Sequence, residues 1–237
     1  MKRLITVICT LLLCWNAFSN NVFLVAVGIS NYPGTVNDLN LPVADAKAMV
    51  DLYKTNRATS TKLILNANAT RKEIIKTASA LFKNAGPSDI VILFFSGHGI
   101  PGGFCAYDDF LLYDDIKAIF SNCKSNHKII FADACFSGRI REPSAERKRI
   151  SNDSDVMLFL SSRHNETSLE SAGMKNGFFT TCLIKCLKGA ADGNLDRAIT
   201  AKELFDSVSK GVIRLSNGHQ HPVMWGNFSN NMVVMQW

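Results

Sequence analysis

The sequence lacks the features that mark several classes of protein. It has no internal repeat and no low-complexity segment, and the net charge is only +6. It has no basic helix with interleaved aromatic residues, so we do not expect it to bind nucleic acid. What it does have is 237 residues, of which 47% are hydrophobic, with 15 Phe among them. That is enough for one sizeable α/β core, and one domain is the simplest count.

No long hydrophobic run is present, and the apolar run from Leu4 to Trp15 is too short to span a bilayer comfortably. Two basic residues precede this run, and a small-x-small tripeptide ending at Ser19 follows it. This order is typical of a secretory signal peptide. We therefore predict a signal peptide over residues 1–19, a mature domain over residues 20–237, and export to the periplasm or the medium. No stable membrane span would remain after cleavage; a short membrane anchor or a first strand is the alternative.

Cleavage after Ser19 would remove two of the seven cysteines and leave an odd number. An exported protein with five cysteines has at least one free thiol, and Cys135 is the natural candidate. Cys182 and Cys186 lie four residues apart on a predicted helix, a spacing poorly suited to a mutual disulfide. Cys105 and Cys123 could pair, and the sequence leaves that open.

Apolar runs alternate with segments of helical periodicity along the chain. The runs predict strands over residues 22–29, 61–65, 90–95, 128–134, 156–160 and 232–235. Helical spacing predicts helices over residues 43–53, 70–82, 114–120, 177–187 and 201–213. The alternation indicates a mainly parallel sheet with helices on both faces. The polar segment over residues 139–155 has no periodicity and is expected to be a surface loop.

Two of the predicted strands end at a reactive side chain followed closely by glycine. The first breaks into Ser-Gly-His-Gly at residues 96–99, and the second ends in Asp-Ala-Cys-Phe-Ser-Gly at residues 133–138. Strands that end at one edge of a parallel sheet deliver their terminal residues into a shared crevice. We therefore expect His98 and Cys135 to meet, and a Cys beside a His can form a strongly nucleophilic thiolate. The alternatives are a buried core cysteine and a histidine that is merely a satisfied polar group.

These two motifs resemble those of the caspase-like cysteine peptidases, and the metacaspase and bacterial caspase-like branch more than the animal caspases. The resemblance runs from about Val22 to Trp237. It implies a caspase-like three-layer αβα sandwich with a mainly parallel central sheet. It also implies that Cys135 is the nucleophile, that His98 is the general base and acid, and that the amides of Gly99 and Cys135 form the oxyanion hole.

At Asp133 the sequence differs from the animal caspases, and this residue bears on the specificity for substrate side chains. Side chains alternate along a strand, so residues 133 and 135 are expected to point to the same side. A carboxylate there would raise the pKa of the Cys135 thiol unless a cation fills the space. The Arg or Lys side chain of a substrate is such a cation. The resemblance implies that Asp133 lines the S1 pocket and that Asp45 is a second S1 acid. The alternatives are a structural Asp at a strand end and an exposed or capping residue on a helix.

The segment between Arg139 and Arg149 carries five basic residues. It follows the predicted nucleophile and offers the residues that the pocket should prefer. It is therefore either a self-cleavage loop or an ordinary solvated connection.

No metal or other cofactor is predicted, although calcium is an alternative at two places. Residues 192, 194, 196, 200 and 203 fit positions 1, 3, 5, 9 and 12 of a calcium loop, but Arg197 stands where that loop needs glycine. Thr200 and Glu203 also form an ordinary capping-box pattern. Metacaspases often bind calcium through acids near the motifs, and four residues here could contribute: Asp108, Asp109, Asp114 and Asp115. Glu142 stands where an Asp would be expected.

We thus predict an exported cysteine endopeptidase that cuts proteins or peptides after Arg or Lys through a His98–Cys135 dyad. One alternative is a non-catalytic caspase-like module that binds partners, although such a module needs neither residue. Another is a different hydrolase with the same dyad, such as an amidase. The sequence indicates no oligomeric state.

Overall fold

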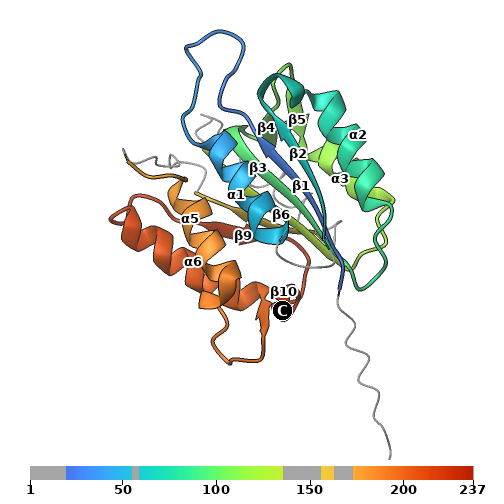
Figure 1. Ribbon diagram of the computed structural model, residues 1–237, viewed down its shortest axis with the longest axis vertical. Helices are drawn as coiled ribbons and strands as arrows, with labels where there is room; N and C mark the ends of the chain where they lie inside the picture. Colours follow the sequence, from blue (N-terminus) through green and yellow to red (C-terminus); the bar gives the residue numbers. More distant parts are fainter. Residues whose placement is uncertain (1–19, 55–58, 136–155, 163–172, 237) are drawn as a thin grey trace, which may run out of the picture.

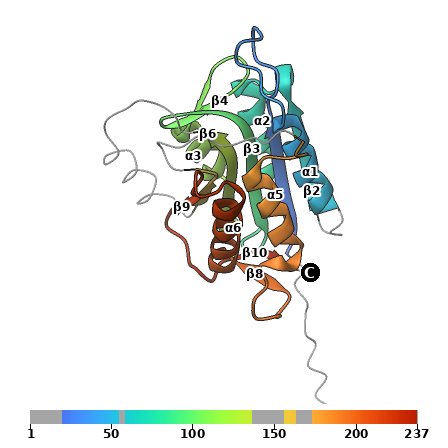
Figure 2. The ribbon, with the colours of Figure 1, turned by 90° about the vertical axis from the view of Figure 1, so that its left-hand side faces the viewer.

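The computed structural model describes residues 20–54, 59–135, 156–162 and 173–236. Its centre is a sheet covered by helices on both faces, a three-layer αβα sandwich (Figures 1 and 2). The strand order across the sheet is β2 (Thr59–Leu65), β1 (Val22–Gly28), β3 (Ile90–Ile100), β6 (His127–Cys135), β7 (Val156–Leu160) and β9 (Val223–Trp225). All neighbours on this path pair in parallel except β9, which runs antiparallel to β7. The predicted mainly parallel sheet is confirmed.

Two apolar cores hold the layers together. One lies between the sheet and the helices α1 (Pro42–Lys54), α5 (Phe178–Lys185) and α6 (Ala201–Leu215). The other lies between the sheet and the helices α2 (Arg71–Phe82) and α3 (Tyr113–Ser121). In β1, Leu24 belongs to the first core and Val25 to the second. The strands read as continuous apolar runs because both faces are covered.

Capping side chains fix where two of the helices begin. The Thr70 side chain accepts a hydrogen bond from the Glu73 amide at 3.2 Å at the start of α2. At the start of α6, Thr200 accepts from the Glu203 amide at 3.3 Å, and the Glu203 carboxylate accepts from the Thr200 amide at 3.0 Å. Each contact satisfies a backbone donor that the first turn of a helix leaves without a partner.

The two central strands run further than the sequence predicted. β3 continues through His98 to Ile100, and β6 continues to Cys135. Both extend because each strand finds a backbone partner on the other as far as the pair His98–Cys135. The glycines on either side of His98 do not end the strand, since Gly99 pairs with Phe104 of a hairpin that lies beyond the sheet path.

Several short elements gave no periodic signal in the sequence. They are the strands β4 (Gly103–Cys105), β5 (Phe110–Leu112) and β8 (Ala198–Thr200), and the 3-10 helix η1 (Asn66–Asn68). The π-helix η2 (Cys186–Ala190) follows α5, where the sequence predicted one helix over residues 177–187. After β3 the chain turns back to pair β4 with β3, and β4 and β5 then form a hairpin. β8 pairs with β10 (Val233–Gln236) in a separate two-stranded sheet.

Four cysteines in the described part are free thiols: Cys105, Cys123, Cys182 and Cys186. Cys105 and Cys123, whose pairing the sequence left open, are therefore not joined. In the ranges that the structure describes, every helix is too short or too polar to cross a membrane. The predicted signal peptide and the basic segment over residues 139–149 lie outside those ranges.

Candidate active site

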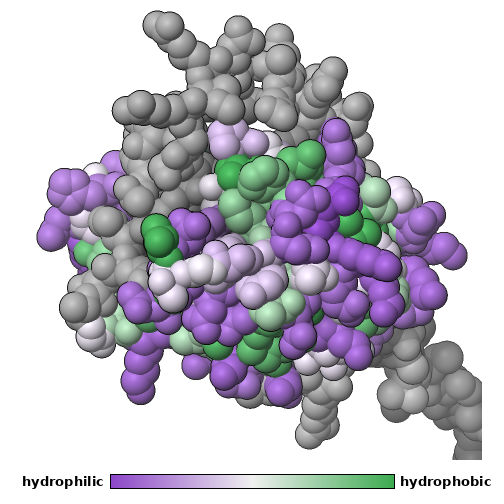
Figure 3. Space-filling view, turned by 90° about the horizontal axis from the view of Figure 1, so that it is seen from above, coloured by the Kyte–Doolittle hydropathy of each residue, from purple (hydrophilic) through white to green (hydrophobic). Residues whose placement is uncertain are grey.

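The structure places the backbones of His98 and Cys135 opposite each other. They are the last pair in the parallel register between β3 and β6. Neighbouring strands are about 4.8 Å apart, so the two positions lie side by side at one edge of the sheet. The side chain of Cys135 lies outside what the structure describes. Figure 3 views the molecule from above Figure 1 and shows small apolar areas among mostly hydrophilic residues.

A main-chain carbonyl holds the imidazole of His98. Nε2 of His98 lies 2.7 Å from the carbonyl oxygen of Asn37, in the loop between β1 and α1. A carbonyl can only accept, so this contact requires the proton to be on Nε2 and leaves Nδ1 as the acceptor of the neutral ring. The sequence showed no orienting residue for His98, because a backbone carbonyl can come from any residue type.

Tyr32, in the same loop, contacts His98 in two ways. Its hydroxyl accepts a hydrogen bond from the His98 amide at 2.9 Å and donates one to the Cys105 carbonyl at 3.2 Å. Its ring lies against the imidazole, with centroids 4.8 Å apart and the planes tilted by 45°. A Cβ on Gly97 would come within 2.7 Å of the Tyr32 hydroxyl, so glycine at this position permits the approach. Burial raises the pKa of Tyr32 above its usual range, and the hydroxyl therefore stays protonated.

Asp45 is buried beside the end of β3. Only 2% of its surface is exposed, although it lies in the first turn of α1. One carboxylate oxygen accepts from the Ser96 hydroxyl at 2.9 Å. The other accepts from the Asn176 side-chain amide at 2.9 Å and from the Gly177 amide at 3.1 Å. The alternative of an exposed helix residue is therefore wrong for Asp45.

Asp133 is also buried, and it lies on the same face of the sheet. Its carboxylate accepts from the amide and the hydroxyl of Thr180, at 3.1 and 2.8 Å, at the start of α5. A Cβ on Gly177 would come within 2.5 Å of this carboxylate, while the amide of Gly177 donates to Asp45. The two acids that the sequence singled out therefore meet at one glycine.

Burial and the nearby Asp133 together change the pKa of Asp45. Burial, followed by the negative charge of Asp133, raises the pKa of Asp45 from 3.8 to about 7, against the opposing effect of its hydrogen bonds. Among the described residues, Asp45 has no ion-pair partner. Ser96, which binds Asp45, is two residues before His98 in β3, so both side chains leave the same face of the strand.

Gly99 lies at the same edge of the sheet. It is the first β3 residue beyond the pairing with β6, directly after His98, and it pairs with Phe104 of β4. The amide positions suggested for an oxyanion hole, Gly99 and Cys135, thus lie at the ends of two neighbouring strands.

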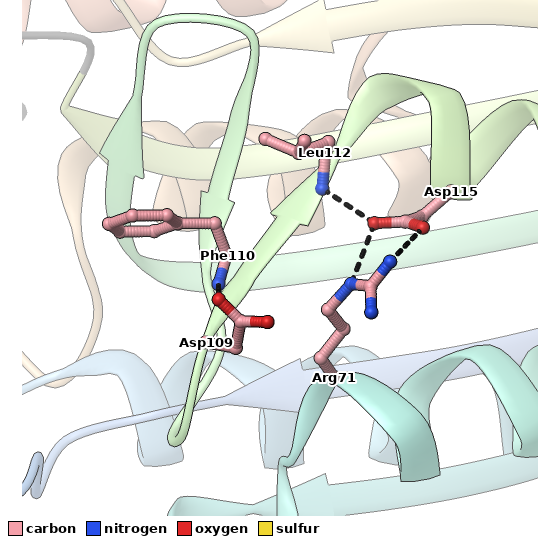
Figure 4. A network of polar contacts seen from close by, with 5 residues as sticks. All are labelled: Arg71, Asp109, Phe110, Leu112 and Asp115. Carbon is pink, nitrogen blue, oxygen red and sulfur yellow. Dashed lines mark hydrogen bonds and ion pairs between the residues drawn. The ribbon is translucent and has the colours of Figure 1, made fainter.

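Two of the acids between the two motifs, Asp115 and Asp109, accept hydrogen bonds from nearby groups. The Arg71 guanidinium donates to the Asp115 carboxylate at 3.0 and 2.6 Å, and the Leu112 amide donates to it at 3.0 Å (Figure 4). The Asp109 carboxylate accepts from the amide of Phe110 (Figure 4). Arg71 thus supplies the positive charge here. In the described part of the chain, no group of three or more potential metal ligands comes together.

The calcium-loop pattern over residues 192–203 forms a tight loop. The Asp192 carboxylate accepts from the amides of Asp196 and Arg197, at 3.2 and 3.1 Å, and Glu203 is bound to Thr200. Arg197 has a φ of 66°, the left-handed conformation that glycine usually supplies. The turn thus forms with Arg at the position where a calcium loop needs glycine, and hydrogen bonds within the loop hold it in place. Glu142 lies outside the described residues.

This strand order, with a His and a Cys opposite each other on two central parallel strands, defines a caspase-like fold. The family model for the caspase domain matches residues 23–232, and the chain belongs to that family. It is a caspase-like peptidase domain, and its expected substrates are proteins.

Two solved structures show the same fold at low sequence identity. The crystal structure of protein GSU0716 from Geobacter sulfurreducens is 20% identical, with a TM-score of 0.67, and the match covers 91% of this chain and 97% of that one. Caspase-1 from Spodoptera frugiperda is 14% identical, with a TM-score of 0.66, and the match covers 91% and 89% of the two chains. No curated protein matches this chain.

Proposed function

We propose that this chain is an exported cysteine endopeptidase that cuts its substrates after Arg or Lys, with His98 and Cys135 as the catalytic pair. The observation that carries the specificity is the pair of buried acids that meet at Gly177. Asp133 lies two strand positions before Cys135, and its register partner is Ser96, whose hydroxyl binds Asp45. A side chain that enters beside the nucleophile would reach both acids.

The charge of this pocket favours a cation over an anion. Burial, and after it the negative charge of Asp133, raises the pKa of Asp45 to about 7, so the two carboxylates resist joint ionisation. A substrate guanidinium or ammonium would let both acids ionise, and a guanidinium could donate to them in parallel. A substrate Asp would add a further negative charge, so the pocket discriminates by repulsion as well as by attraction.

The proposed reaction uses the geometry around His98. The Cys135 thiol gives its proton to Nδ1 of His98, while the Asn37 carbonyl keeps the other proton on Nε2. The thiolate attacks the scissile carbonyl carbon, and the amides of Gly99 and Cys135 stabilise the negative oxygen. The imidazolium then protonates the leaving amine, and water hydrolyses the thioester with His98 as the base.

The order of residues 1–19 supports export, and the basic segment over residues 139–149 supports self-processing, because it offers Arg and Lys next to the nucleophile. A binding module needs neither the His98–Cys135 pair nor the two buried acids beside it. No cofactor takes part in the proposed reaction.

Paired fluorogenic peptides test the proposal. The peptides differ only at P1, which is Arg in one and Asp in the other, and Cys135→Ala serves as the control. We expect turnover of the Arg peptide only, and none by the variant. Equal turnover by Cys135→Ala would reject the nucleophile, and a preference for Asp would reject the pocket. Release of ammonia from simple amides without peptide cleavage would support the amidase alternative.

A further inference from the structure

We propose that Tyr32 is a positioning residue for His98, which fixes the imidazole in the orientation that activates Cys135. This inference rests on the proposed function, since it takes His98 as the base. Tyr32 holds the histidine at both of its ends: the hydroxyl binds the main-chain amide, and the ring lies against the imidazole. The backbone and the side chain of His98 are thus constrained by one residue.

The phenol also ties together two strands that carry the site. Its hydroxyl accepts from His98 in β3 and donates to the carbonyl of Cys105 in β4, so it uses both of its hydrogen-bonding capacities. The protonated state that its burial favours is required for the second contact. A Phe at this position would keep the ring against the imidazole but would leave the His98 amide and the Cys105 carbonyl without this partner.

The loop that carries Tyr32 is itself held in shape. The Asp38 carboxylate accepts from the Tyr32 amide at 2.9 Å, and the Leu39 amide donates to the Ser30 carbonyl at 2.8 Å. Asn37, whose carbonyl binds Nε2 of His98, lies between these contacts. In Figure 1 this blue loop rises from the end of β1 towards α1. One loop therefore presents a phenol and a carbonyl to the same imidazole.

The chain offers a matched control for removal of the hydroxyl. Tyr53, in α1, is fully buried in the core, and among the described residues its hydroxyl has no hydrogen-bond partner. Tyr53→Phe therefore removes a buried hydroxyl without removing a contact, while Tyr32→Phe removes two contacts at His98. The difference between the two variants isolates the effect on the histidine.

The decisive readout is the pH profile of Cys135 alkylation by iodoacetamide, followed by mass spectrometry of the peptide that contains Cys135. In the wild type we expect alkylation to persist well below the ordinary thiol range near pH 8.5, because His98 stabilises the thiolate. In Tyr32→Phe we expect the midpoint to move up towards that range and kcat to fall about tenfold, with KM within twofold. Tyr53→Phe should match the wild type in all three quantities.

An alkylation profile and a kcat in Tyr32→Phe equal to those of Tyr53→Phe would overturn the inference, as would an ordinary thiol profile in the wild type. If the wild type cleaves no peptide but Tyr32→Phe still shifts the profile, the proposed function fails and the positioning role stands. Should Tyr32→Phe fail to fold, Asp38→Ala replaces it, because Asp38 is exposed and supports Tyr32 only from its amide. It should shift the profile in the same direction by a smaller amount, and an unchanged profile would count against the inference.

Discussion

Replacing Asp45 by Asn should make the protein more stable and less active on Arg peptides. The folded protein holds the pKa of Asp45 at about 7, against 3.8 for the ordinary side chain. Between these two values the folded state keeps a proton that the unfolded chain has lost. The stability due to this proton is therefore fully present below about pH 4 and is lost as the pH rises through about 7.

The magnitude follows from the size of the shift. At 1.36 kcal/mol for each pH unit between 3.8 and about 7, the upper limit is roughly 4 kcal/mol. Relaxation of the pocket reduces this, and we expect Asp45→Asn to gain about 1–3 kcal/mol in the free energy of unfolding at pH 8. The Asn can keep its oxygen as the acceptor for Asn176 and Gly177, and its amide can donate to the Ser96 hydroxyl.

Urea unfolding at pH 5 and pH 8 measures this effect, with Asp51→Asn as the control on the exposed side of the same helix. The stability gain of Asp45→Asn over the wild type should be less than half as large at pH 5 as at pH 8, while Asp51→Asn should show no such dependence. On the Arg peptide, Asp45→Asn should lose at least tenfold in kcat/KM at pH 8. A variant less stable than the wild type at both pH values would refute the reasoning about the buried acid pair.

Three further predictions follow from the same geometry. His98→Ala should abolish peptide turnover while circular dichroism shows an unchanged fold, and turnover near the wild-type level would remove His98 from the mechanism. Gly177→Ala should lower the free energy of unfolding in urea by about 1–3 kcal/mol, because its Cβ would lie 2.5 Å from the Asp133 carboxylate. Gly193→Ala is the control, since its Cβ would meet only a carboxylate oxygen at 3.9 Å and should leave stability unchanged. The wild type should nick itself between Arg139 and Arg149 and Cys135→Ala should not; an uncut and fully active wild-type species in intact mass spectrometry would show that the segment is a solvated connection.

The sequence predicted the layers of this fold because its signals are periodic. Apolar runs such as residues 90–95 and 156–160 are covered on both faces, and the helices that cover them carry clear apolar stripes. The strand ends were predicted less well, because pairing with a neighbouring strand carries β3 through the glycines around His98. Three-residue strands such as β4 and β8 are too short to show a period.

The same contrast holds for the candidate site. Asp45 and Asp133 could be proposed from motif position, and the structure brings them together at Gly177. The support for His98 could not be proposed. Every residue type has a backbone carbonyl, so nothing in the sequence marks Asn37 as a partner of His98. Tyr32 lies in a Tyr-Pro-Gly segment, which indicates only a turn. Contacts made by a loop that folds back over a strand end depend on tertiary packing, which local sequence does not encode.

Cleavage-site profiling on a peptide library tests the central claim most directly. The library is digested with the wild type and with Asp133→Ala, and the residue before each cut bond is identified by mass spectrometry. We predict Arg or Lys at that position for the wild type, and for Asp133→Ala a loss of most cleavage while Cys135 still reacts with a small alkylating agent. Cuts after Asp in the wild type, or an unchanged Arg preference in Asp133→Ala, would contradict the account of the acid pair.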